Sequence, residues 1–246
     1  MRLGVCCAAA DVAGVLAAGF DYAETPAGEL FKEPCVKCVA TNQFFPFGAR
    51  LFGPDPFDWR AYVDRLLDRA VGAGVEIMVI GSGAARHSDP SQRPGDADEA
   101  FMDIAAEISH KAAPRGVIIA PESLRQEETD VANDAEKLAA GLLRRGTAYT
   151  LDIYHALVEW RRAFGLAAID AQFVERHLTI NPAHVHLSDI DRSLPQEGDP
   201  LVALVLRRLV ALGFNGRVSL ECSDGVMEDL ALARARVAEC LQDGIR

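Results

Sequence analysis

The chain has 246 residues, half of them apolar, and a formal net charge of −11 at pH 7. This length allows one sizeable buried core, and the acidic balance argues against a nucleic-acid partner, because affinity for phosphate backbones comes mostly from Lys and Arg. No stretch approaches the roughly 18 consecutive apolar residues of a membrane-spanning helix. We therefore expect a soluble protein that acts on small molecules and has no membrane partner.

Cysteine usage favours a reducing compartment. The six cysteines are Cys6, Cys7, Cys35, Cys38, Cys222 and Cys240. In a chain this long they do not form a disulfide framework, and the pair at 35 and 38 has no second pair to complete a zinc site. The apolar start of the chain resembles a signal peptide, but Asp11 interrupts it, so we interpret it as a buried strand followed by a helix. A cytoplasmic protein with reduced thiols is expected.

Eight short runs rich in apolar or β-branched residues follow one another along the chain, and stretches with helical periodicity lie between them. The predicted strands are residues 2–8, 20–24, 36–42, 75–81, 116–122, 148–155, 184–189 and 217–222. The clearest predicted helices are residues 58–74, 96–112, 130–146 and 201–214. Eight strand-and-helix units in about 250 residues are typical of an α/β fold of the TIM-barrel type, (β/α)8, here as a single domain over residues 1–246.

A doubly wound open sheet is the alternative fold. Such sheets usually carry a glycine-rich phosphate-binding turn after the first strand. This chain has Cys6-Cys7-Ala8-Ala9-Ala10 at that place. The barrel is therefore the preferred prediction.

Acidic and imidazole side chains end the last four predicted strands. They are Glu122, Asp152 with His155, His186 with Asp189, and Glu221. Glu122, Asp152, His186 and Glu221 follow one another at intervals of 30, 34 and 35 residues, about one strand-and-helix unit each. A barrel would bring these four groups together at the C-terminal ends of its strands. Three carboxylates and one imidazole suit one divalent ion, Mn²⁺ or Mg²⁺ first, with Co²⁺ or Zn²⁺ as alternatives.

Two histidines are candidate metal ligands in the segment HVHLSDIDR, residues 184–192. Alternation along a strand puts His184 and His186 on the same face. His184 would lie about 6–7 Å deeper in the barrel, at two strand residues. A metal that substrate can reach needs the outer residue, so we predict His186 as the ligand and His184 as a hydrogen-bonded core residue.

The chain resembles the xylose isomerase-like TIM barrels, and within them the sugar phosphate isomerase/epimerase group that includes ketose 3-epimerases and hydroxypyruvate isomerases. The family pattern is a Glu after strand 5, DxxH after strand 6, HxHxxD or HxHxxE with a downstream Arg at strand 7, and a Glu that ends strand 8. The matching segments are PESLRQEET at 121–129, DIYH at 152–155, HVHLSDIDR at 184–192 and SLEC at 219–222.

The resemblance implies a role for each matching residue. It makes Glu122, Asp152, His186 and Glu221 the metal ligands, with Glu122 and Glu221 also the catalytic acid and base. It makes Glu128, His155 and Arg192 contacts to substrate hydroxyls, although Glu128 and Arg192 could equally be surface charges. Asp189 either accepts a hydrogen bond from a ligating imidazole or begins a turn.

Two further segments are weaker matches to the family, TNQFFP at 41–46 and GSGAAR at 81–86. They add Asn42 and Arg86 as predicted substrate contacts. Glycines in the second segment would let the backbone approach a ligand, and Arg86 would meet an anionic group. The alternative for that segment is a tight turn with a solvated arginine.

The implied enzyme is a metal-dependent carbohydrate isomerase or epimerase. It would abstract a proton next to a ketose carbonyl and pass through an enediolate that the ion stabilises. Barrels of this type are often dimers or tetramers, so the resemblance allows a homo-oligomer. The sequence does not separate an epimerase from an aldose–ketose isomerase or from a dehydratase of a cyclic polyol ketone, nor does it identify the sugar, its phosphorylation or the metal.

Two other classes of function are weighed against this one. Apurinic-site endonucleases share the superfamily, but they need further histidines after strands 3 and 4, where this chain has Thr41-Asn42-Gln43 and Gly81-Ser82-Gly83. His87 lies a few residues beyond strand 4 and keeps that alternative open, while the net charge opposes it. A barrel that only binds a metal or a sugar would not need two acid–base glutamates.

Overall fold

The structure is a computed structural model that describes residues 1–91, 93, 95–195, 200–223 and 226–243, with side chains as far as residue 239. The side chain of Cys240 therefore lies outside the described part. Cys35, Cys38 and Cys222 are free thiols. In the described ranges, no helix combines the length and the apolar character that crossing a membrane requires.

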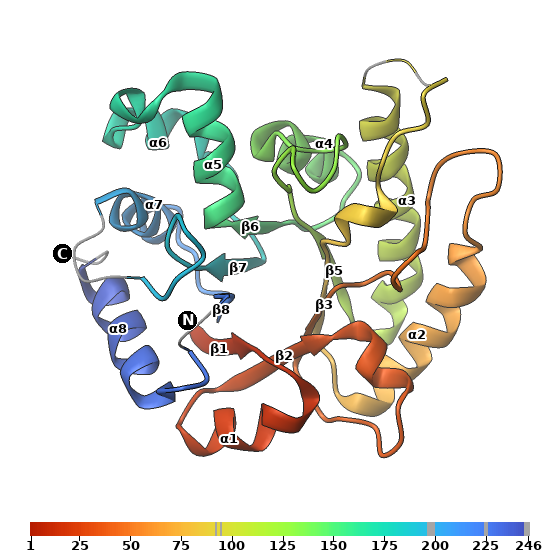
Figure 1. The fold of residues 1–246 in the computed structure, drawn as a ribbon, viewed down its shortest axis with the longest axis horizontal. Helices are drawn as coiled ribbons and strands as arrows, with labels where there is room; N and C mark the ends of the chain where they lie inside the picture. The colour runs from red at the N-terminus through yellow and green to blue at the C-terminus, as the bar shows by residue number, and fades with distance from the viewer. Residues whose placement is uncertain (92, 94, 196–199, 224–225, 244–246) are drawn as a thin grey trace. The chain divides into compact units, whose positions relative to one another are not determined.

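Strands and helices alternate along the chain (Figure 1). The strands are β1 (Arg2–Cys6), β2 (Tyr22–Pro26), β3 (Ala40–Asn42), β4 (Ile77–Ile80), β5 (Ile118–Pro121), β6 (Thr150–Asp152), β7 (His184–Leu187) and β8 (Arg217–Leu220). The α-helices are α1 (Val12–Ala17), α2 (Trp59–Ala73), α3 (Asp96–Ala112), α4 (Ala135–Arg144), α5 (Ile153–Phe164), α6 (Ala171–His177), α7 (Pro200–Ala211) and α8 (Leu230–Asp243). Each predicted strand overlaps an observed strand, although β2 extends two residues beyond the predicted range 20–24, and the predicted (β/α)8 fold is confirmed.

Several predicted boundaries are wrong, and two of them share one cause. The strand predicted over 148–155 ends at Asp152, because that residue caps α5 and the chain turns directly into the helix. The helix predicted over 130–146 begins only at Ala135, after the side chain of Asp134 has accepted hydrogen bonds from the first free amides of the helix. In both places a capping aspartate ends the preceding segment.

The chain forms two compact units. The first unit comprises Met1–Ala23 with Leu151–Arg246, and the second unit comprises Glu24–Thr150. In the first unit, β8 pairs in parallel with both β1 and β7. In the second unit, β3 pairs in parallel with β2 and β4, and β4 pairs with β5.

Each unit buries its strands beneath helices. In the first unit α5 packs against β7, and in the second α3 packs against β5. Every residue of β4 and of β7 is buried, as expected for parallel strands covered on both faces. Buried polar side chains at the ends of such strands are costly unless they are paired. The polar residues after β5, β6, β7 and β8 are therefore candidates for function.

Aspartate caps set where several helices begin. Asp170 precedes α6, and its Oδ1 accepts a hydrogen bond of 2.8 Å from the amide of Phe173. We predict that Asp170→Ala lowers the free energy of unfolding by about 1 kcal/mol, because one amide of the first turn loses its acceptor. Urea titration followed by circular dichroism measures the change. Asp170→Asn keeps a capping oxygen and is the control, and equal stability of Asp170→Ala and the parent would contradict the assignment.

Candidate metal and catalytic site

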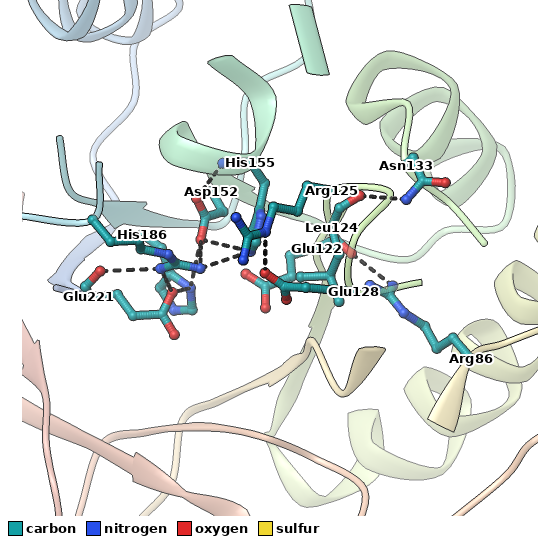
Figure 2. A network of polar contacts seen from close by, with 11 residues as sticks. Arg86, Glu122, Leu124, Arg125, Glu128, Asn133, Asp152, His155, His186 and Glu221 are labelled. Atoms are coloured by element: carbon teal, nitrogen blue, oxygen red, sulfur yellow. Dashed lines mark hydrogen bonds and ion pairs between the residues drawn. The ribbon is translucent and has the colours of Figure 1, made fainter. Parts of the chain in front are cut away.

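Asp152 serves two structural purposes at the end of β6. Its Oδ1 accepts a hydrogen bond of 2.9 Å from the amide of His155, which caps α5 (Figure 2). Its Oδ2 lies 3.6 Å from Nε2 of His155 and 3.9 Å from Nδ1 of His186. The side chain is only 1% exposed, and the positive end of the helix dipole favours its negative charge. The spacing of the DxxH motif thus has a local cause. Asp152 caps α5 and His155 is the third residue of that helix, so both lie at the same helix end.

His186 and Glu221 come from the paired strands β7 and β8. The ladder continues one residue beyond β8, because the amide of Glu221 donates to the carbonyl of Leu187 at 3.1 Å. Nδ1 of His186 then lies 3.1 Å from Oε2 of Glu221. Ligating atoms of Asp152, His186 and Glu221 lie within 4.8 Å of one another. Two carboxylates and one imidazole at such spacing form a donor set that a divalent ion fits.

Arg192 lies among these groups. Its guanidinium donates to Oε2 of Glu221 at 2.6 Å and lies 3.3 Å from Oδ2 of Asp152. It also donates to Nε2 of His155 at 2.8 Å, and its Cζ lies 4.6 Å from the ring centroid of Tyr154. The alternative of a surface charge is therefore wrong for Arg192.

A tight turn after β7 places Arg192. The amide of Arg192 donates to the carbonyl of Asp189 at 3.0 Å, and the amide of Asp189 donates to the carbonyl of Ser193 at 2.9 Å. Arg192 has a φ of 66°, a conformation that residues other than glycine rarely adopt. The amide of Ser223 donates to the carbonyl of Arg192 at 2.8 Å, which ties the turn to the chain after β8. Asp189 thus begins a turn, one of the two roles considered for it.

The contact between Arg192 and His155 defines the protonation of the imidazole. A guanidinium carries only donors, so Nε2 of His155 is the acceptor in this hydrogen bond of 2.8 Å. A neutral imidazole with an acceptor at Nε2 carries its proton at Nδ1. His155 therefore enters the site as a neutral ring.

Opposite charges hold Glu221 in its ionised form. Burial raises the pKa of Glu221, but His186 and Arg192 lower it by more, so that it lies well below its ordinary value. The attraction between the carboxylate and these two neighbours, including the hydrogen bond from the guanidinium, outweighs the effect of burial on the pKa. Glu221 is therefore a carboxylate at neutral pH.

His184 and His186 lie on the same side of β7, as strand alternation predicts. Their ring centroids are 5.0 Å apart, with the rings edge to face. His184 is completely buried and lies 6.5 Å from the ring of Tyr22, whose hydroxyl is 2.9 Å from Oγ of Ser219. The surroundings of His184 are those of a packed core residue.

Glu122 follows β5 in the second unit and is 5% exposed. Its carbonyl accepts a hydrogen bond of 2.9 Å from Nη1 of Arg86 (Figure 2). A Cβ atom at Gly81 would overlap Oε1 of Glu122, so the glutamate side chain lies directly over the end of β4. Glu128, later in the same loop, is about one-third exposed and pairs with Nε of Arg125 at 2.8 Å.

Asn42 and Arg86 are both buried in the second unit. Asn42 ends β3, and its Oδ1 has no hydrogen-bond partner among the described residues. Arg86 has no exposed surface, so the alternative of a solvated arginine is wrong. Contact of these two residues with substrate stays a prediction.

The structure thus groups the predicted site residues by unit. Asp152, His155, His186, Arg192 and Glu221 form one cluster in the first unit. Glu122 and Glu128 lie on the loop after β5 in the second unit. Arg86 belongs to the neighbouring segment 81–86, which contacts that loop. Tyr154, whose ring faces the guanidinium of Arg192, was not predicted from the sequence as a site residue. Its position within the DIYH motif was the available signal.

Parallel strands that alternate with helices, and buried carboxylates beside an imidazole at the strand ends, define a barrel with a candidate divalent-metal site. A family model described as Xylose isomerase-like TIM barrel matches residues 12–242. The chain belongs to this family, which confirms the resemblance found in the sequence.

Solved structures with the same fold include two sugar epimerases and one protein with a bound zinc atom. A D-psicose 3-epimerase crystallised in the presence of D-fructose has a TM-score of 0.78 and 16% identity, covering 98% of this chain and 99% of that one. An L-ribulose 3-epimerase has a TM-score of 0.72 and 16% identity, covering 100% and 96%. The IOLI protein with a bound zinc atom has a TM-score of 0.60 and 16% identity, covering 100% and 98%. At this identity the likeness shows the fold alone. No curated protein matches the sequence.

The charge state of Glu221 makes a prediction about acid stability. Since its folded pKa lies below its ordinary value of 4.5, the stabilisation is present above about pH 4.5 and is lost as the pH falls through the folded value. We expect Glu221→Gln to be less stable than the parent at pH 7 by about 1–3 kcal/mol, a difference that shrinks on acidification. Thermal unfolding in EDTA between pH 7 and pH 3 measures it. A difference that stays constant over this range would contradict the assignment.

Proposed function

We propose that the protein is a divalent-metal-dependent epimerase or isomerase of ketose sugars or sugar phosphates. The observation that carries this proposal is the cluster of Asp152, His186 and Glu221 at the ends of three strands, with Arg192 and His155 beside it. Membership of the xylose isomerase-like family and the sugar epimerases among the solved structures support the same chemistry.

We infer that Glu122, Asp152, His186 and Glu221 hold one divalent ion. The donor chemistry of the first-unit cluster supports this, and Mn²⁺ or Mg²⁺ suits its carboxylates best, with Co²⁺ or Zn²⁺ as alternatives. A bound ion would act as a Lewis acid on a carbonyl and the neighbouring hydroxyl of an α-hydroxy ketone, and so make the adjacent C–H more acidic.

Proton transfer is assigned to the two glutamates. The ionised carboxylate of Glu221 can take a proton from the carbon next to the carbonyl. Glu122, carrying a proton taken up from solvent, would give it to the opposite face of that carbon, and the two glutamates would exchange roles for the reverse direction. Transfer between opposite faces inverts the carbon, which is the outcome of an epimerisation.

Arg192 and His155 would orient the substrate. The guanidinium is held from several sides, by Glu221, His155 and the ring of Tyr154, so its donors point in fixed directions. Fixed donors suit the binding of a carbonyl or hydroxyl oxygen, because little motion has to be frozen on binding. His155, whose Nε2 accepts a hydrogen bond from Arg192, is assigned with that guanidinium to the orientation of a substrate hydroxyl. Glu128 and Asn42 are assigned to further hydroxyls.

A phosphodiesterase acting at apurinic sites has less support. His87, the histidine nearest to the end of β4, lies 3.5 Å from Asp130 and is about half exposed. The ends of β3 and β4 carry Asn42 and Gly81 where that chemistry would need imidazoles. A dehydratase of a cyclic polyol ketone would share the first proton abstraction and stays an alternative. A homo-oligomer stays a prediction. We expect the enzyme to act in the cytoplasm.

Metal binding is the first test of the proposal. Calorimetric titration of EDTA-treated protein with Mn²⁺ should show one ion per chain. His186→Ala should weaken the affinity at least about 100-fold, because an inner ligand is lost. His184→Ala is the matched control from the same strand and should keep the affinity, although it costs stability. Metal retained by His186→Ala and lost only in His184→Ala would reverse the assignment.

Solvent exchange tests the chemistry directly. The Mn²⁺-loaded protein should incorporate deuterium from heavy water at the carbon beside a ketose carbonyl, in a panel that includes D-psicose, D-fructose and ketose phosphates. Glu221→Gln and Glu122→Gln should each slow exchange by about 10²- to 10⁴-fold. Glu107→Gln, on the outer surface of α3, is the control. Exchange as fast as the parent in Glu221→Gln would rule out the two-glutamate mechanism, and cleavage of abasic-site DNA without exchange would favour the phosphodiesterase.

A further inference from the structure

The segment GSGAAR, residues 81–86, supports the loop after β5 that carries Glu122 and Glu128. A Cβ atom at Gly81 would overlap Oε1 of Glu122. A Cβ atom at Gly83 would lie 2.8 Å from the carbonyl oxygen of Glu128. The loop can lie this close because neither position has a side chain. Gly81 and Gly83 therefore leave the space that the loop after β5 occupies.

Arg86 ends this segment with a fully buried guanidinium. Its Nη1 donates to the carbonyl of Glu122 at 2.9 Å, as Figure 2 shows, and its Cζ lies 4.5 Å from the ring centroid of Phe101. Burial lowers the pKa of Arg86 to about 10, while the charges of Glu122, Glu128 and Asp98 act in the opposite direction. The side chain is therefore a buried cation at neutral pH.

The hydrogen bonding of Arg86 is incomplete for a purely structural group. Nε and Nη2 are buried and have no hydrogen-bond partner within the described ranges. A buried cation with two unsatisfied donors is costly, and an apolar side chain of similar length could fill the same volume against Phe101 at lower cost. The acceptor that Arg86 does have is the main chain of Glu122.

The other end of the loop is held as well. Nδ2 of Asn133 donates to the carbonyl of Leu124 at 2.7 Å and to the carbonyl of Thr129 at 2.9 Å. Ser82 has a φ of 42°, and its Oγ accepts a hydrogen bond of 2.9 Å from the amide of Phe45. A backbone held in such a conformation indicates that the surrounding structure constrains it. Hydrogen bonds therefore hold both the loop after β5 and the segment that supports it.

We propose that Arg86 is a positioning residue for Glu122, and that residues 81–86 exist to fix the carboxylate of Glu122 rather than to contact substrate. This inference rests on the proposed function, in which Glu122 is both metal ligand and acid–base group. The buried guanidinium fixes the main chain of Glu122 at the end of β5, and Gly81 leaves the space in which the side chain lies. A misplacement of a reacting group by about 1 Å can cost about 100-fold in rate.

The test uses Arg86→Gln, which keeps one donor nitrogen but no charge, and Arg86→Lys, which keeps the charge but not the planar guanidinium. We expect both to lower kcat for deuterium exchange by about 10- to 100-fold, with KM changed less than about threefold. Mn²⁺ affinity should fall by about 10-fold or more in calorimetry. Thermal unfolding shows whether each variant is folded, and crystal structures of parent and Arg86→Gln locate the carboxylate of Glu122.

Arg145→Met is the matched control. Arg145 lies in the same unit. Its guanidinium donates to Glu99 and Asp103, two residues on the surface of α3, at 2.7 Å each. Its loss should lower thermal stability and leave kcat and Mn²⁺ affinity unchanged. A merely structural Arg86 would behave in the same way.

The outcomes separate the two proposals. Reduced kcat and Mn²⁺ affinity in a folded Arg86→Gln, with a displaced Glu122 carboxylate, support positioning. Parent-like kcat and Mn²⁺ affinity in that variant overturn it. A parent that neither binds Mn²⁺ nor exchanges deuterium overturns the proposed function instead, and the position of the Glu122 carboxylate in the two crystal structures then decides the role of Arg86. If Arg86→Gln does not fold, Arg86→Lys is judged by the same measurements.

Discussion

The carboxylate of Asp152 is the constraint on which the first-unit cluster depends. One of its oxygens completes the start of α5, and the other faces His155, His186 and Arg192. Because the helix needs this cap, the carboxylate cannot rotate away without exposing an unsatisfied amide. The direction of the second oxygen is thereby set by secondary structure. His155, three residues on, is positioned by the same helix start, so the cap determines the place of two site residues together.

Charge compensation is local in each unit. In the first unit Arg192 faces two carboxylates and an acceptor nitrogen, and its stacking on Tyr154 limits its motion. In the second unit the buried cation of Arg86 donates to the main chain that carries Glu122. Neither guanidinium is placed as a solvated surface charge would be. Both are held close to groups that the proposed reaction needs, which is how a site is prepared before substrate arrives.

Sequence periodicity was enough to predict the strands, because parallel strands buried on both faces read as short continuous apolar runs, of which IMVI in β4 is an example. The acidic and imidazole residues at their ends could be predicted for the same reason, since strand ends converge. Other features depend on tertiary contacts. The positive φ of Arg192 comes from a turn closed by Asp189 and Ser193, and no glycine marks it in the sequence. The burial of Arg86 arises from the neighbouring loop and from Phe101, which lies 15 residues away in the chain.

The absence of a side chain at Gly81 has a consequence for efforts to change what this protein accepts. The space above the end of β4 is already filled by a glutamate from the next strand. Enlarging residue 81 would push against that carboxylate, so diversity introduced there would displace the proposed acid–base group rather than reshape a pocket. Variation is better placed at the exposed residues Gln43 and Phe47, which flank the buried Phe44 and Phe45. Side chains changed at these two positions do not enter the space that the Glu122 carboxylate occupies.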